Sequence, residues 1–204
     1  AAQSGAPLIV LLLIGPLVGA ICGAFNGFLV TRVGLPSIVV TIGTMSLFRG
    51  LAQVVLGDQV ITQYPKDYKA IGQSYLINWP PLPWSFVIFL FTAAIFAVVL
   101  HKTAFGRKLY AIGNNPTAAK FSGIAVERIR FRLFILTGIL AGLAAMLLTA
   151  RIGSTRPNIA LGWELEIITM VILGGVSIAG GAGTIPGVVL AVFILGLITF
   201  GLSL

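Results

Sequence analysis

The longest basic interruption of this apolar sequence is centred on Asn114-Asn115-Pro116-Thr117-Ala118-Ala119-Lys120-Phe121-Ser122-Gly123. Asn115 can cap the free amide groups of a first helical turn, and Pro116 suits the first helical position. Gly123 can adopt the left-handed conformation that closes a helix. The stretch therefore predicts a short helix with both ends marked. Because so short a helix is marginal in water, we expect it to need a partner surface.

The composition of the rest of the chain is that of a membrane-embedded protein. Hydrophobic residues make up 58% of the 204 residues, charged residues make up 9%, and the mean hydropathy is +1.07. Soluble domains are about one quarter charged. The sequence therefore predicts an all-α fold, a polytopic transmembrane helical bundle that forms a single domain over residues 1–204.

The distribution of charge orients this predicted bundle. Seven of the thirteen basic residues lie in residues 101–132, together with a single acidic residue, whereas residues 57–83 and 151–166 carry equal numbers of each sign. Because cytoplasmic loops of membrane proteins are enriched in Lys and Arg, we expect 101–132 to be cytoplasmic and the other two segments to be outer loops. Nucleic acid is not expected as a partner, since its binders gather basic residues with aromatic residues on a water-exposed face.

Six membrane segments are predicted, one of them short or broken. We expect four at residues 7–31, 37–56, 84–100 and 133–150. Residues 167–204 contain no charged residue and are interrupted by glycine-rich turns. The stretch from Ile167 to Ala179 is only thirteen residues long, shorter than the roughly twenty that a straight helix needs to cross a bilayer. The fifth segment is therefore expected to be short, broken or re-entrant.

Glycines recur at every fourth position in the first span, at Gly15, Gly19, Gly23 and Gly27. This spacing places them on one helix face, where another backbone can approach closely. Gly138 and Gly142 form a similar pair in the fourth span. The pattern predicts a close helix–helix interface.

Polar residues and glycines inside the spans are candidates for a solute pathway. Thr41, Thr44 and Ser46 could line it, or could instead bond to carbonyl groups of their own helix. Irregular backbone at membrane depth is tolerated only against protein or a water-filled cavity. The glycine turns near the end of the chain are therefore candidates for a gate, at Gly174, Gly175 and Gly181.

The sequence contains no motif for catalysis or energy transduction. It has no phosphate-binding loop, no Gly-x-Ser-x-Gly elbow and no paired histidines. With one Cys and one His, we expect no metal site. The spans contain no Asp or Glu, whereas ion-coupled carriers commonly place ionisable groups there. We therefore expect a protein that is not an enzyme, binds no cofactor itself, and is driven by a cytoplasmic partner.

Several motifs carry a family resemblance over nearly the whole chain. Residues 106–115 read Gly-Arg-Lys-Leu-Tyr-Ala-Ile-Gly-Asn-Asn and are followed by Ala118-Ala119 and Ser122-Gly123-Ile124. Asn26-Gly27 precedes them, and Gly180-Gly181-x-Gly183 follows. Together they resemble the membrane subunits of bacterial ATP-binding-cassette importers for monosaccharides, of the ribose, xylose, galactose and rhamnose type, to which autoinducer-2 permeases are related. The sequence departs from the general importer signature at Thr117, where an acidic residue is usual.

The resemblance implies an inner-membrane permease subunit for a sugar, with rhamnose as one candidate and autoinducer-2 as its rival. The implied partners are a second permease subunit, a periplasmic sugar-binding protein and a cytoplasmic subunit that holds ATP and Mg. The resemblance adds Asn26 to the candidate pathway residues. It also implies further membrane spans before Ala1. The inner helix would couple the permease to the ATPase through Asn115, Pro116, Thr117, Ala118, Ala119, Lys120, Phe121, Ser122 and Gly123. A passive channel with residues 180–183 as its filter is the alternative.

Overall fold

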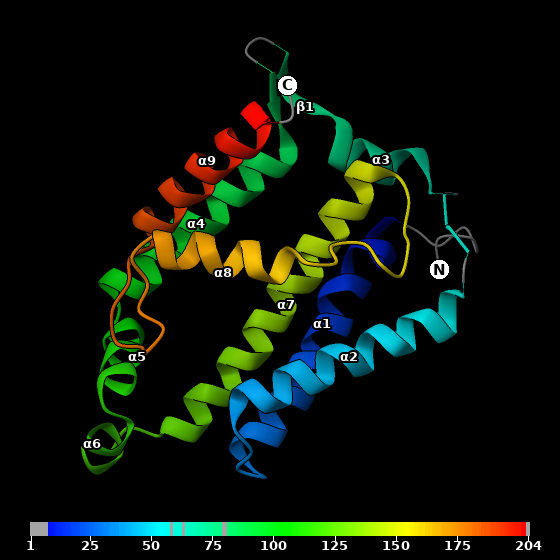
Figure 1. Cartoon of the computed structure of the whole chain (residues 1–204). Helices are drawn as coiled ribbons and strands as arrows, with labels where there is room; N and C mark the ends of the chain where they lie inside the picture. Colours follow the sequence, from blue (N-terminus) through cyan, green and yellow to red (C-terminus); the bar gives the residue numbers. More distant parts are fainter. Residues whose placement is uncertain (1–7, 58, 63, 79–80, 203–204) are drawn as a thin grey trace. The chain divides into compact units, whose positions relative to one another are not determined.

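The computed structural model describes residues 8–202 apart from 58, 63 and 79–80, so residue 7 of the first predicted span and four residues of the loop 57–83 lie outside it. The described residues form nine helices and one two-stranded hairpin (Figure 1). Five helices are long and apolar enough to cross a membrane: α1 (Leu8–Thr31), α2 (Ser37–Leu56), α4 (Trp84–Lys102), α7 (Val126–Ile152) and α9 (Ile185–Leu202). The predicted all-α membrane fold is confirmed.

The chain divides into two compact units. Unit 1 contains the residues up to Val87 together with Glu127–Ile159, and unit 2 contains Ile88–Val126 and Ala160–Leu204. Unit 1 holds α1, α2, nearly all of α7, the short helix α3 (Lys66–Gln73) and the hairpin of β1 (Tyr75–Asn78) and β2 (Pro81–Pro83). Unit 2 holds most of α4, with α5 (Ala104–Asn114), α6 (Pro116–Phe121), α8 (Trp163–Leu173) and α9.

Within unit 1, α1 and α7 pack against each other through glycine. A Cβ atom added at Gly15 would lie 2.8 Å from the carbonyl oxygen of Gly142. One added at Gly19 would collide with the carbonyl group of Gly138, and one at Gly23 would collide with the backbone of α7. The two backbones are therefore in direct contact, which confirms the interface that the glycine spacing predicts.

The segments predicted to be outer loops meet at one end of unit 1. Ile61 and Thr155 form a backbone bridge, and the Tyr64 hydroxyl lies 2.6 Å from Thr155 Oγ1. Tyr68 on α3 is only 4% exposed, and its hydroxyl donates a 3.0 Å hydrogen bond to the Met146 carbonyl. Ile61, Tyr64 and Tyr68 thus lie against the C-terminal end of α7 and the residues that follow it. The sequence did not predict α3 or the hairpin.

The predicted cytoplasmic segment 101–132 is mostly helical. It contains α5 and α6, and α7 begins at Val126 rather than at Leu133. The cluster of arginines at residues 128–132 therefore belongs to the first two turns of a continuous helix. Glu127 in the first turn favours this earlier start, because a negative charge there complements the helix dipole.

The segment predicted to be short is the helix α8. Its 11 residues give a length of about 16 Å, well below the roughly 30 Å of a bilayer core. The helix ends at Gly174, and irregular backbone continues until α9 begins at Ile185. A Cβ atom at Gly174 would lie 2.6 Å from the Cα of Val188, so α8 and α9 pack closely within unit 2.

Candidate functional site

The short inner helix α6 has the ends that the sequence predicts. Asn115 Oδ1 accepts a 3.0 Å hydrogen bond from the backbone N–H of Ala118, and Pro116 is the first helical residue. Gly123 follows the helix with a φ of 80°, the left-handed conformation that glycine adopts at little cost. The helix is thus held by its own caps.

Most of the α6 surface is exposed. Ala119 is buried, at 4% exposure, whereas the ring of Phe121 is 90% exposed. Thr117, Ala118 and Lys120 are exposed as well. An aromatic side chain held in water on a capped helix can be buried by a partner without any rearrangement of the helix.

The helix α5 joins α6 to the glycine turn at residues 180–183. The Tyr110 hydroxyl donates a 2.6 Å hydrogen bond to the Gly183 carbonyl. Gly113 lies so close to this turn that a Cβ atom there would lie 2.8 Å from Gly181 Cα and collide with Gly181 N. Gly180 and Gly181 have φ values of 94° and 77°, which favour glycine. The segment before α6 is therefore in backbone contact with a predicted pathway glycine.

The three predicted pathway glycines lie in one irregular connection between α8 and α9. Gly174 is buried against α9 and Gly175 is exposed with a φ of 85°. The N–H of Ser177 donates a 3.0 Å hydrogen bond to the carbonyl of Ala182, which closes the loop that carries Gly181. A displacement of this loop would therefore act directly on the ends of two helices.

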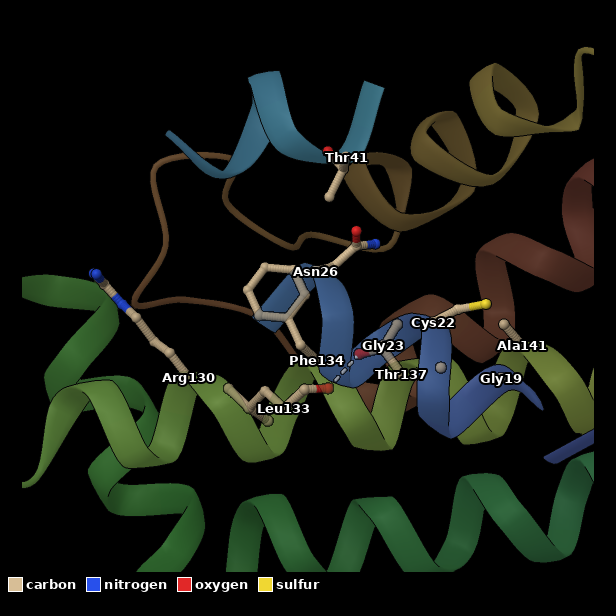
Figure 2. A pocket seen from close by; sticks show the side chains of 11 residues that line it. Gly19, Cys22, Gly23, Asn26, Thr41, Arg130, Leu133, Phe134, Thr137 and Ala141 are labelled. Atoms are coloured by element: carbon tan, nitrogen blue, oxygen red, sulfur yellow. Dashed lines mark hydrogen bonds between the residues drawn. The ribbon is translucent and has the colours of Figure 1, made fainter. Parts of the chain in front are cut away.

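The remaining pathway candidates belong to unit 1. Asn26 and Thr41 line a cavity of about 510 Å³ between α1, α2 and α7, where Thr41 faces Asn26 (Figure 2). Thr44 is buried and Ser46 is exposed, and neither lines this cavity. The apolar side of the cavity is formed mainly by α7. Its other lining residues are Gly19, Cys22, Gly23, Arg130, Leu133, Phe134, Thr137, Gly138 and Ala141.

Hydrogen bonding separates Asn26 from the other polar candidates. Thr41 and Thr44 each donate a 2.9 Å bond to a carbonyl of α2, and Ser46 donates one at 3.3 Å. Asn26 Oδ1 is buried and accepts no hydrogen bond from any residue that the structure describes. Leaving a buried acceptor unpaired costs about 1–3 kcal/mol. Asn26 is therefore ready to accept a hydrogen bond from a solute or from water.

Sequence reasoning missed Tyr110 and Gly113 as functional residues. Both lie in the motif 106–115, so the family resemblance marked the segment but not their contacts. Tyr110 and Gly183 are 73 positions apart, and no helical or turn periodicity connects them.

A membrane fold with a short capped helix in its basic segment, and with irregular backbone between a short apolar helix and a membrane-crossing helix, is typical of a transport permease. The family described as "Branched-chain amino acid transport system / permease component" matches residues 1–203. The chain belongs to this family and is an integral protein of the inner membrane.

Named relatives agree with this assignment. The chain is 36% identical over 203 residues to the ribose import permease protein RbsC of Bacillus subtilis (strain 168). The aligned region covers 98% of the chain and 62% of that protein. It is 36% identical over 195 residues to the autoinducer 2 import system permease protein LsrC of Yersinia pseudotuberculosis serotype IB (strain PB1/+). This alignment covers 96% of the chain and 55% of that protein. The LsrC protein of Yersinia enterocolitica serotype O:8 / biotype 1B (strain NCTC 13174 / 8081) is 39% identical over 179 residues, which are 88% of the chain and 49% of that protein.

The chain thus spans between about half and 62% of the length of these relatives. No solved structure matches it significantly. The resemblance to importer permeases that the sequence motifs indicated is confirmed.

Proposed function

We propose that this chain is the translocating membrane part of an ATP-driven importer for a sugar or a sugar-like molecule. Relatives named for ribose and for autoinducer-2 support a small, polyhydroxylated solute. Rhamnose, which the sequence resemblance suggests, is a third candidate. A periplasmic binding protein would deliver the solute, and a second permease subunit would complete the pathway.

The observation that carries this proposal is the exposed helix α6 and its connection to the glycine turn. The five long helices contain a single acidic residue, Glu127, in the first turn of α7. Proton- or sodium-coupled carriers commonly place ionisable groups at membrane depth, so an outside source of energy fits this chain better. A cytoplasmic subunit that holds ATP and Mg would supply it.

The contacts within unit 2 suggest how this energy reaches the membrane. A groove on the cytoplasmic subunit would receive α6 and cover Phe121. Movement of α6 would shift α5, since the two helices pack together. Tyr110 and Gly113 would then carry the shift to the turn at residues 180–183, and so to the ends of α8 and α9.

The cavity in unit 1 has features suited to a polyhydroxylated solute. Asn26 Oδ1 would accept a hydrogen bond from a hydroxyl group of the solute, which would satisfy its buried oxygen. The ring of Phe134 and the side chain of Leu133 offer apolar surface to the carbon face of a sugar ring. We therefore assign Asn26 to solute contact.

The test uses the full-length permease with its partner subunits in liposomes. Ala118→Glu places a charged side chain on the exposed face of α6, and we expect it to abolish ATP-driven uptake of labelled ribose and autoinducer-2 and to reduce co-purification of the ATPase subunit. Ala104→Glu, on an exposed position at the start of α5, is the matched control. Normal uptake by Ala118→Glu would contradict the coupling role. A solute flux that is the same with and without nucleotide would favour a passive channel.

A further inference from the structure

A second cavity, of about 700 Å³, opens where the inner end of α1 meets the first turns of α7. It shares no lining residue with the Asn26 cavity, and four of its seven lining residues are charged. Its lining includes Phe28, Arg32, Glu127, Arg128, Phe131 and Arg132. Three arginines and one glutamate give this lining a formal charge of +2.

The three arginines outnumber Glu127, the one acidic side chain that lines the cavity, and they are not paired with it in the part of the chain that the structure describes. Arg32, Arg128 and Arg132 are exposed, and none of their side chains forms an ion pair or a hydrogen bond with a described residue. Arg128 and Arg132 lie four positions apart on one face of α7, where like charges repel each other. The cavity therefore favours an anion.

The position of the cavity indicates which anion. Arg32 directly follows α1, and Arg128 lies in the first turn of α7, so both are at the basic ends of membrane-crossing helices. This is the depth of the phosphate groups of the inner leaflet. The aromatic side chain of Phe28 at the cavity rim is 53% exposed and can contact a lipid tail.

An exposed apolar stripe continues from this rim along α1. Ile21 and Leu17 are 61% and 60% exposed, and they precede Phe28 by seven and eleven positions on the same helix face. An acyl chain could lie along this stripe while its headgroup occupies the cavity. A free inorganic anion would use the arginines but not the stripe.

We infer that this cavity binds the headgroup of an anionic phospholipid of the inner leaflet. The guanidinium groups of Arg32, Arg128 and Arg132 hold the phosphate oxygens, to which arginine can donate paired hydrogen bonds. The acyl chain follows Phe28, Ile21 and Leu17. The lipid thereby neutralises the charge where α1 and α7 meet, next to their glycine interface.

The experiment measures phosphatidylglycerol that stays bound to the purified full-length protein after detergent exchange, by native mass spectrometry. One variant combines Arg32→Gln, Arg128→Gln and Arg132→Gln. The matched control combines Lys102→Gln, Arg107→Gln and Lys108→Gln, which removes the same charge elsewhere in residues 101–132. Each arginine near an anionic membrane surface contributes about fivefold to binding, so we expect a loss on the order of a hundredfold in the first variant. The three control side chains do not line the cavity, so the lipid held there should be lost far less in the control.

A third variant separates lost binding from lost folding. Replacing the three arginines by lysine keeps the charge, and we expect it to restore most of the bound lipid. Unchanged retention in the glutamine variant, or equal losses in that variant and its control, would overturn the inference. Displacement of the lipid by millimolar inorganic phosphate would assign the cavity to a free anion instead. Loss of the ATPase subunit with the lipid retained would assign it to a protein contact.

Discussion

Gly113→Ala tests the contact between α5 and the glycine turn. Replacing glycine by alanine inside a helix normally stabilises it by about 1 kcal/mol. At Gly113 the new Cβ atom would collide with Gly181 N and would lie 2.8 Å from Gly181 Cα. Both are backbone atoms, so no side chain can rotate away, and such overpacking typically costs about 1–3 kcal/mol. The overpacking cost less the helix gain is roughly 0–2 kcal/mol, so we expect the turn to be displaced or loosened by a net loss of about 1 kcal/mol.

Hydrogen–deuterium exchange of the amides in residues 177–183 measures this effect directly. The N–H of Gly180 donates to the carbonyl of Ser177 at 3.0 Å, and this bond belongs to the closed loop. A net loss of about 1 kcal/mol corresponds to exchange that is about five times faster. In liposomes, the same variant should hydrolyse ATP with little solute uptake.

Gly196→Ala provides the matched control, because Gly196 lies in α9 of the same unit and a Cβ atom there would have nothing within 4 Å. We expect this variant to keep slow exchange and normal uptake. If Gly113→Ala behaves like Gly196→Ala in both measurements, α5 does not contact the turn as described, and the proposed route of coupling is wrong.

Three further changes test other parts of the molecule. Gly19→Leu should lower the melting temperature in detergent, because the Gly138 carbonyl occupies the place of the new side chain; an unchanged melting temperature would argue against the α1–α7 contact. Asn26→Leu should stabilise the protein by roughly 1–3 kcal/mol, because it removes a buried oxygen that has no partner among the described residues, and it should weaken solute uptake; unaltered uptake would exclude Asn26 from solute contact. Burial raises the pKa of Tyr68 above its ordinary 10.0, opposed by the Thr149 hydrogen bond. The folded protein therefore holds the phenolic proton more tightly, so this contribution to stability is complete below about pH 10 and is lost as the pH rises through the folded-state pKa. A chemical-denaturation series should show a smaller alkaline loss of stability in Tyr68→Phe, and identical pH profiles would disprove the link.

The sequence alone was sufficient to predict the membrane class, the number of long spans and the ends of α6. A run of about twenty apolar residues can be recognised as a membrane span without knowing which helices pack beside it. The caps at Asn115 and Gly123 act within a single turn, so they could be recognised without knowledge of the fold. The glycine spacing in α1 predicted a close interface because it places all four residues on one face, and the structure identified α7 as the partner.

Only the tertiary structure decided which polar side chains are available to form a hydrogen bond with a solute. From the sequence, Thr41 and Thr44 were pathway candidates as good as Asn26, yet their hydroxyl groups are bonded to α2, whereas the Asn26 oxygen has no partner among the described residues. Whether a side chain finds a partner depends on the surrounding elements, which the sequence of one helix does not specify. The hydrogen bond from Tyr110 to Gly183 is of the same kind, because it depends on how the loop between α8 and α9 folds back onto α5. Caps and helix spacing act over a few residues, whereas these contacts join segments that only the folded chain brings together.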